Sequence, residues 1–364
     1  MAIPSLRARQ PQPTSRAASA GCARSWRRRN PPPDDGRSLN ATERVQLGHT
    51  GLRVTRLGLG TAPLAGLFEE VPEDKALAVI ERSWLAGIRF YDTAPLYGHG
   101  LAELRSGRVL REKPRDEFIL ASKVGRLLRA DAPPEPGQAF RGTPPVNPVF
   151  DFSYDGVMRS VEESLERLGL ERIDILHIHD PDDHFEQALS GAYRALDELR
   201  RDGVIKAVGA GMNQAEMLIR FAKEADFDCF LLAGRYTLLD QIALQELLPV
   251  CLERGVAIIA GGVYNSGILA DPKPGAHYNY AVAPPELIER AQRIGLVCAR
   301  HGVPIKAAAV QFPLGHPAVT CVVVGCRSAA QFDESLAMFE FEIPSAMWQE
   351  LKHEGLITAE APTP

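Results

Sequence analysis

The sequence predicts an α/β protein built on a (β/α)8 TIM barrel, preceded by a β-hairpin and a disordered N-terminal tail. Short apolar runs alternate with segments of helical spacing through most of the 364 residues. Eight such runs can be counted, which favours a closed barrel over an open doubly wound sheet. No GxGxxG motif follows the first run, so an open dinucleotide-binding fold is not indicated.

The N-terminal segment, residues 1–43, differs from the rest of the chain in composition. It holds an arginine run at 27–29 and a proline run at 31–33, and it has neither helical nor strand periodicity. We therefore expect a disordered tail whose first 40 residues make no contact with the core. Its many arginines and few acids also match an organelle transit peptide, so a dispensable extension and a targeting signal remain open. Without such a signal the protein would be cytoplasmic.

Residues 44–364 are expected to form one barrel domain. The segment from Val45 onward, broken by Gly48 and Gly51, predicts a hairpin that leads into the first barrel strand. The expected strands cover residues 57–61, 88–93, 118–123, 173–179, 205–210, 229–234, 256–261 and 321–326. Helices are expected at 73–87, 154–169 and 185–203, and several of them end in glycine.

Two longer stretches rich in proline and glycine interrupt this rhythm. They cover residues 125–152, after the third strand, and residues 262–285, after the seventh. In a barrel, the connections that follow strands lie on the face that carries the active site. Both stretches are therefore candidate substrate or cofactor loops.

Composition argues against several classes of protein. No run approaches the roughly 18 uncharged apolar residues of a membrane span, so a soluble protein without a membrane partner is expected. Residues 1–40 hold eight arginines against two aspartates, and the rest of the chain has an acidic excess, so no nucleic-acid partner is expected. The six cysteines show no CxxC spacing and no pairing with histidine at zinc-site spacing. We expect buried free thiols in a reducing compartment and no metal site.

Four polar side chains follow three neighbouring strands. Asp92 ends the second expected strand and Tyr97 comes five residues later, whereas Lys123 ends the third strand and His179 the fourth. Taken singly, a loop cap, a packing aromatic or a solvated strand end would explain each of them. Because the carboxyl ends of barrel strands share one face, we expect the four to lie together. His177 lies one layer deeper and is expected to be a neutral, hydrogen-bonded core histidine.

Together these groups predict proton transfer to or from a substrate oxygen. A tyrosine with a pKa of about 10 is a poor base at neutral pH, but the Lys123 ammonium would favour the phenolate and lower the pKa of Tyr97. Asp92 would hold Lys123 in place and offset its buried charge. His179 would align the substrate oxygen by a hydrogen bond.

The segment YDTAPLYG at residues 91–98 is close to the signature of the aldo-keto reductase family, and the resemblance extends over nearly all of residues 44–354. It implies that Asp92, Tyr97, Lys123 and His179 are catalytic and that a nicotinamide cofactor is bound. The segments GAGMNQ and VVVGCRSAAQFDES resemble the family's carboxamide-binding strand and adenosine-binding turn. The cofactor-binding residues so implied are Gly60, Thr61, Asn213, Gly325, Cys326, Arg327, Gln331, Glu334 and Ser335.

The chain departs from the family pattern at two places that bear on the cofactor. Strand seven usually carries an aromatic that stacks on the nicotinamide, but Gly262 and Val263 stand there and Tyr264 is the nearest candidate. Members that use NADPH usually have Lys or Arg where this chain has Gly325 and Gln331. The resemblance thus implies a preference for NAD, with NADP also accepted if Arg327 turns onto the extra phosphate.

Several stretches, including GLGTAPLAGLF and LHIHDPDDH, resemble the branch of the family that contains L-fucose dehydrogenase and D-threo-aldose 1-dehydrogenase. That branch implies oxidation of an aldose of the L-fucose, D-threo-aldose or L-galactose type at the anomeric carbon to the lactone, with the sugar as small-molecule partner. Alternatives that use the same site are an NADPH-dependent aldehyde or ketone reductase and a pyridoxal 4-dehydrogenase. A cofactor-binding regulatory subunit is a further alternative, against which the complete catalytic group argues.

Overall fold

The computed structural model describes residues 39–134 and 137–364. Within them, eight parallel strands pair in chain order and close into a barrel, in which the last strand pairs with the first. The barrel strands are β3 (Leu57–Gly60), β4 (Phe90–Asp92), β5 (Ile119–Val124), β8 (Ile175–His179), β9 (Ala207–Met212), β10 (Cys229–Ala233), β11 (Ala257–Gly261) and β14 (Val319–Gly325). The predicted barrel and its eight strands are confirmed, although β9 lies two residues later than expected.

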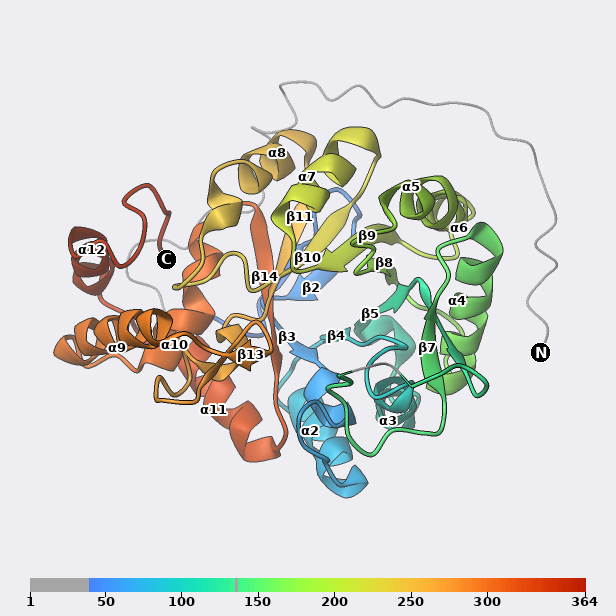
Figure 1. The fold of residues 1–364 in the computed structure, drawn as a ribbon, viewed down its shortest axis with the longest axis horizontal. Coiled ribbons are helices and arrows are strands. Elements are labelled where there is room, and N and C mark those ends of the chain that lie inside the picture. Colours follow the sequence, from blue (N-terminus) through green and yellow to red (C-terminus); the bar gives the residue numbers. More distant parts are fainter. Residues whose placement is uncertain (1–38, 135–136) are drawn as a thin grey trace.

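Helices surround the strands in chain order, as Figure 1 shows. Amphipathic spacing produces them, and caps set their ends: the Ser153 hydroxyl accepts from the Gly156 amide at the start of α4, and Gly169 ends α4 with φ 62°. The α-helices are α2 (Glu73–Leu85), α3 (Leu101–Leu110), α4 (Tyr154–Leu168), α5 (Phe185–Gln187), α6 (Arg194–Arg201), α7 (Ala215–Glu224), α8 (Leu247–Arg254), α9 (Pro285–Arg300), α10 (Ile305–Gln311), α11 (Ala329–Phe339) and α12 (Ser345–His353). The helix expected at 185–203 is divided, because a π-helical segment at Ala188–Tyr193 joins α5 to α6.

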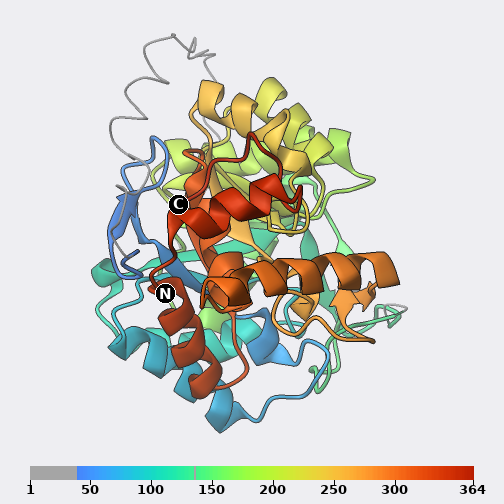
Figure 2. The ribbon, with the colours of Figure 1, turned by 90° about the vertical axis from the view of Figure 1, so that its left-hand side faces the viewer.

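One end of the barrel is closed by the predicted hairpin, β1 (Arg44–Gln46) and β2 (Arg53–Thr55). Val45, Leu47 and Val54 belong to an apolar cluster with residues from the barrel strands, such as Phe90 and Ala121. Figure 2 shows the hairpin in blue at the edge of the barrel, with α9 and α12 on the outside. Ligands are therefore expected to enter at the opposite end, where the strands finish.

The two proline- and glycine-rich stretches contain short hairpins that the sequence did not predict. In the first, β6 (Arg126–Arg129) pairs with β7 (Asn147–Phe150), and in the second, β12 (His277–Tyr278) pairs with β13 (Ala281–Val282). The first hairpin begins one residue after β5 because Gly125 adopts φ 102°, and a Cβ at this position would lie 2.1 Å from the Phe152 ring. Both hairpins follow carboxyl ends of barrel strands, as expected of substrate or cofactor loops.

The folded domain begins earlier than the expected boundary at residue 44. Leu39 is 7% exposed and Ala41 is fully buried, and both belong to the main apolar core. The Ala41 amide donates to Glu340 at 3.2 Å, and the Ala41 carbonyl accepts from the Leu57 amide. The last residues assigned to the tail are thus part of the barrel domain, because burial of Leu39 and Ala41 in the core stabilises this part of the chain. The expectation of disorder for the rest of the tail concerns residues 1–38, which lie outside the described residues.

Two truncations test this boundary. Deletion of residues 1–43 removes Leu39 and Ala41 from the core, whereas deletion of residues 1–38 keeps them. We expect the longer deletion to lower the free energy of unfolding by about 2 kcal/mol relative to the shorter one, mainly through Leu39. Thermal melting of the two proteins measures the difference, and equal melting temperatures would show that residues 39–43 do not stabilise the barrel.

The described cysteines are free and buried, as expected: Cys229, Cys251, Cys298, Cys321 and Cys326. Cys22 lies outside the described residues. Among the helices of residues 39–134 and 137–364, we find none with the length and apolar character that crossing a bilayer requires.

Candidate active site

The four predicted catalytic residues come together at the carboxyl ends of β4, β5 and β8. Asp92 is the last residue of β4, and His179 is the last residue of β8. Lys123 lies on β5, the strand between these two, and pairs in register with His177 of β8. Tyr97 reaches the same place from the loop after β4, with its ring 5.6 Å from that of His179 in an edge-to-face arrangement. Parallel register therefore brings together residues that are far apart in the sequence, as expected.

Lys123 and Asp92 form a buried ion pair beneath Tyr97. Lys123 Nζ donates to both carboxylate oxygens of Asp92, at 2.8 and 2.7 Å, and to the Thr93 carbonyl at 2.9 Å. The three protons of the ammonium are thereby all used. Lys123 is 1% and Asp92 3% exposed, and burial raises the pKa of Asp92 while the Lys123 charge opposes that rise. The pair is stable only as a pair, because either charge alone would be buried without compensation.

The expected lowering of the Tyr97 pKa by Lys123 is not found. Burial is the main cause that raises the pKa of Tyr97 well above 10, and the negative charge of Asp92 adds to it. Lys123 Nζ lies 4.6 Å from the centre of the tyrosine ring, over its face, and its protons are directed to Asp92 and Thr93. The charge that was expected to favour the phenolate is therefore already neutralised by Asp92.

The two histidines of β8 differ in their surroundings. Burial and the Lys123 charge lower the pKa of His179 well below 6.5, so the ring is neutral and can donate a hydrogen bond to a substrate oxygen. His177 is fully buried, and burial lowers its pKa to about 3, which agrees with the expected neutral core histidine. The expected hydrogen bonds of His177 are not found, since neither ring nitrogen has a partner among the described residues. The ring instead packs over Gly209, where a Cβ would lie 2.2 Å from Nδ1.

An ion pair beside His179 was missed by sequence reasoning. Arg126, the first residue of β6, approaches Asp180, the residue after β8, with 3.5 Å between Nη2 and Oδ2. The same carboxylate oxygen lies 3.5 Å from Nε2 of His179. Burial raises the pKa of Asp180 to about 6, and the Arg126 charge opposes the rise. The only signal in the sequence was the acidic residue Asp180 directly after His179. The sequence did not indicate that Arg126, 54 positions earlier, would be its partner.

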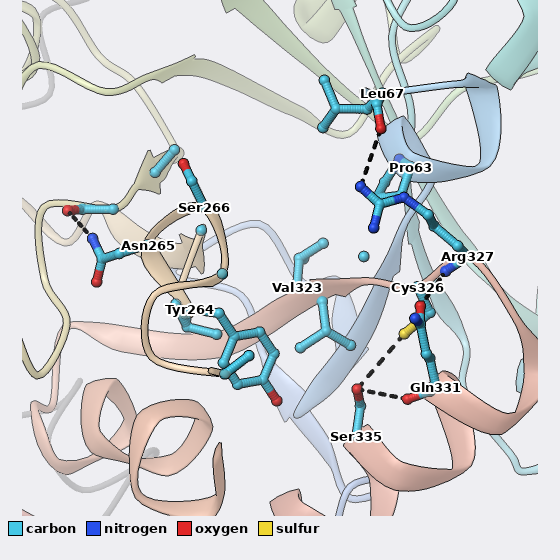
Figure 3. A pocket seen from close by; sticks show the side chains of 18 of the residues that line it. Pro63, Leu67, Tyr264, Asn265, Ser266, Val323, Cys326, Arg327, Gln331 and Ser335 are labelled. Carbon is cyan, nitrogen blue, oxygen red and sulfur yellow. Dashed lines mark hydrogen bonds between the residues drawn. The ribbon is translucent and has the colours of Figure 1, made fainter. Parts of the chain in front are cut away.

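Next to this group lies a cavity of about 350 Å³ between the ends of β10, β11 and β14. Most of the residues predicted to bind the cofactor line it, namely Asn213, Gly325, Cys326, Arg327, Gln331, Glu334 and Ser335. Figure 3 shows several of them, from β14 and α11, facing Tyr264, Asn265 and Ser266 across the cavity. The catalytic residues do not line it, but Tyr280, which does, is close enough to Tyr97 to raise its pKa.

Gly60 and Thr61, also predicted to bind the cofactor, do not line this cavity. Gly60 pairs with Asp92 and Gly325 on the two neighbouring strands, and the Thr61 amide and hydroxyl both donate to the Asp92 carbonyl, at 3.0 and 3.1 Å. Thr61 is fully buried. Both residues thus contact the backbone of Asp92 rather than the cavity.

The cavity offers polar groups that the protein leaves unsatisfied. Arg327 Nε and Asn265 Oδ1 are buried and have no hydrogen-bond partner among the described residues. Arg327 also donates from Nη2 to the Leu67 carbonyl at 3.2 Å, on the side of the cavity opposite Tyr264 and Asn265 (Figure 3). A cationic group with a free donor fits the pyrophosphate of a dinucleotide, and the apolar Val323, Val324 and Met338 nearby fit its rings.

Tyr264 and Lys306 complete the lining near α11. Tyr264, the candidate for stacking on the nicotinamide, lies close enough to Ser335 and Glu334 for both to act on its pKa, which burial raises. It therefore extends to the side of the cavity formed by α11. Tyr280 is the lining tyrosine that lies near Tyr97 instead. Lys306, which the sequence did not single out, forms a 2.7 Å ion pair with Glu334 at the rim.

Comparison with known proteins identifies the family of this chain. Residues 56–354 match the model of the aldo/keto reductase family. The chain is 45% identical to pyridoxal 4-dehydrogenase of Microbacterium luteolum, over 88% of this chain and 99% of that protein. It is 44% identical to D-threo-aldose 1-dehydrogenase of a Pseudomonas species, over 86% and 97% of the two chains. L-galactose dehydrogenase of Arabidopsis thaliana is 31% identical over 80% of this chain and 86% of its own.

Solved structures agree on the fold. The holo form of an aldo-keto reductase from Bacillus halodurans superposes with a TM-score of 0.69 at 25% identity, over 88% of this chain and 98% of that one. A glycerol dehydrogenase from Gluconobacter oxydans gives a TM-score of 0.68 at 22% identity, over 89% and 98% of the two chains. The barrel, the group of Asp92, Tyr97, Lys123 and His179 at its open end and the family match over most of the chain lead to one conclusion: this oxidoreductase belongs to the aldo/keto reductase family.

Proposed function

We propose that this enzyme oxidises an aldose at C1 to the lactone. Tyr97 takes the proton of the C1 hydroxyl while the C–H bond at C1 breaks with its electron pair, and a C=O bond forms at C1. His179, neutral because of its lowered pKa, holds the same oxygen by a hydrogen bond. Asp92 and Lys123 support Tyr97 from below, where the ammonium lies 4.6 Å from the centre of its ring.

The cavity beside β14 would hold the nicotinamide cofactor. Arg327, whose side chain lines the cavity, would bind the pyrophosphate through its guanidinium, and Asn213, the residue after β9, would hold the carboxamide. When bound, the nicotinamide supplies the acceptor for the hydride from C1. Tyr280 borders both the cavity and Tyr97, so the two parts of the site adjoin there.

The similarity of this chain to two sugar dehydrogenases is the observation that favours an aldose as substrate. Both D-threo-aldose 1-dehydrogenase and L-galactose dehydrogenase act on sugars, by their names, and both match across most of this chain. Pyridoxal 4-dehydrogenase is an equally similar relative, so pyridoxal is the second candidate substrate. Reduction of an aldehyde or ketone is the third, because the raised pKa of Tyr97 keeps the phenol protonated as an acid at neutral pH.

A substrate panel with both cofactors tests the proposal. NAD⁺- and NADP⁺-dependent oxidation of L-fucose, L-galactose, D-arabinose and pyridoxal would be measured beside NADH- and NADPH-dependent reduction of simple aldehydes. We expect aldose oxidation to give the highest kcat/KM and to increase with pH, because more Tyr97 is then deprotonated. A higher kcat/KM for pyridoxal, or for aldehyde reduction, would refute aldose oxidation and assign that reaction to the enzyme instead.

We also expect NAD⁺ to be preferred over NADP⁺. The two positions of the adenosine-binding turn that usually carry cations for a 2′-phosphate carry none in this chain: Gly325 has no side chain, and the Gln331 side chain accepts from the Arg327 amide at 2.8 Å. The cation that the turn does hold, Arg327, donates to the Leu67 carbonyl and is proposed to bind the pyrophosphate instead. Lys306 is paired with Glu334, whose carboxylate would repel the phosphate. The lost charge-assisted contacts correspond to about 1.5 to 3 kcal/mol each, which is at least about tenfold in kcat/KM.

The ratio of kcat/KM for the two cofactors with one saturating aldose measures this preference. Gln331→Arg should improve the use of NADP⁺ about tenfold or more, because it places a cation in the turn. Lys352→Arg, on α12 and away from the cavity, is the matched control and should leave the ratio unchanged. Equal or better use of NADP⁺ by the parent enzyme would refute the preference.

A further inference from the structure

The Arg126–Asp180 pair has no part in the proposed proton transfer, yet the fold holds it at the reaction centre. Asp180 has φ 41°, a left-handed conformation that is uncommon for residues other than glycine. Its amide donates to the Gly211 carbonyl at 3.1 Å, which fixes the backbone in this conformation. Such local strain is found most often where a side chain must be aimed at a ligand.

The pair lies beside the histidine nitrogen that would hold the substrate oxygen. Asp180 Oδ2 lies 3.5 Å from Nε2 of His179, the nitrogen that would hold the oxygen on C1. Both Asp180 and Arg126 are close enough to Tyr97 for their charges to act on its pKa, in opposite directions. A group bound by Asp180 must therefore be the immediate neighbour of the reacting carbon.

Arg126 and Asp180 do not satisfy each other's hydrogen-bonding groups. The two side chains are 3.5 Å apart at their closest, which is beyond a good hydrogen bond. Arg126 Nε is buried and has no hydrogen-bond partner among the described residues, while the guanidinium lies over the Phe150 ring at 4.5 Å. The side chain of Arg126 is 10% and that of Asp180 31% exposed, so the carboxylate remains open to a ligand. The hydrogen-bonding capacity that a ligand can use is therefore that of the Asp180 carboxylate.

The chemistry of the pair selects a hydroxyl group. A carboxylate can only accept hydrogen bonds and a guanidinium can only donate them, whereas a hydroxyl does both. In a cyclic aldose, C1 has two neighbours within the ring, the ring oxygen, which has no proton to donate, and C2, which carries a hydroxyl. We infer that Asp180, steadied by Arg126, binds the C2 hydroxyl of the aldose and so makes the enzyme select 2-hydroxylated substrates.

This inference rests on the proposed aldose oxidation and adds to it the substrate group that is recognised. The test is Asp180→Asn, because asparagine tolerates the left-handed backbone and keeps the side-chain shape while it removes the charge. Parent and variant are assayed with the aldose that the parent oxidises best and with its 2-deoxy analogue. Asp183→Asn, an exposed acid in the same loop, is the control for a general loss of negative charge.

In the parent, loss of the C2 hydroxyl should lower kcat/KM about tenfold or more, the effect of one hydrogen bond to a charged group. Asp180→Asn should lower kcat/KM for the full aldose by a similar factor. It should lower kcat/KM for the 2-deoxy sugar little further, because that sugar already lacks the contact that the substitution removes. Asp183→Asn should match the parent on both. Equal losses by Asp180→Asn on both sugars would overturn the inference while leaving aldose oxidation intact. A parent that oxidises no aldose would overturn the proposed function, and the inference with it.

Discussion

Tyr97→Phe is expected to lower kcat for aldose oxidation by at least about 100-fold, because it removes the group that accepts the proton of the C1 hydroxyl. The phenyl ring retains the contacts of the tyrosine ring with His179 at 5.6 Å and with Phe140 at 6.1 Å. Steady-state kinetics with saturating aldose and NAD⁺ measure the loss. A decrease in kcat with little change in KM would place the defect in the chemical step.

Two measurements separate this effect from damage to the fold. Titration of the variant with NAD⁺ should give an unchanged affinity, since Tyr97 does not line the cofactor cavity. Thermal melting should also match the parent closely. Aldose oxidation at a near-normal rate in Tyr97→Phe would assign the proton transfer to another residue.

Lys123→Met is expected to have the largest effect on stability. It removes the cation that both oxygens of Asp92 contact and leaves a carboxylate with 3% exposure inside the barrel. Breaking a buried pair in this way costs about 3 to 5 kcal/mol, a large part of the stability of an ordinary domain. Urea unfolding of parent and variant measures the difference.

The loss in Lys123→Met should increase with pH. Burial already raises the pKa of Asp92, and removal of the opposing lysine charge raises it further. Folded Asp92 then keeps its proton at pH values where unfolded Asp92, with a pKa of about 3.9, has lost it. The folded state binds more protons, so stability falls as pH rises from about 4 toward the folded pKa. A pH-independent difference from the parent would show that Asp92 is ionised in the variant.

A double variant provides the matched control. Asp92→Asn combined with Lys123→Met removes both charges, so the cost of an unpaired carboxylate disappears. We expect it to be more stable than Lys123→Met and to lose the pH dependence. Both proteins lack catalytic groups, so this comparison concerns stability alone.

Local patterns in the sequence determined much of this protein. Apolar runs of strand length, separated by amphipathic segments, correctly predicted eight strands and their order, because each run must be buried and each helix must cover it. The same periodicity predicted that Asp92, Lys123 and His179 end neighbouring strands. Parallel strands then bring them to one face, which is why the location of the catalytic group could be predicted without coordinates.

The boundaries and secondary roles were less predictable. Leu39 was assigned to the tail because its neighbours in the sequence are polar, although it packs into the core. Gly60 and Thr61, at the end of the first expected strand, were assigned to the cofactor from the family resemblance. In the structure Thr61 holds the Asp92 carbonyl 31 residues away, a contact that no local pattern reveals.

Only the tertiary structure decided the electrostatics of the site. The effect of Lys123 on Tyr97 depends on where three ammonium protons point, and they point to Asp92 and Thr93. Likewise, the Arg126–Asp180 and Lys306–Glu334 pairs join residues from separate elements. Sequence determines which charged groups exist and on which element each lies. Their pKa values and partners depend on burial and on distances of a few ångströms, which arise only when the elements pack against one another.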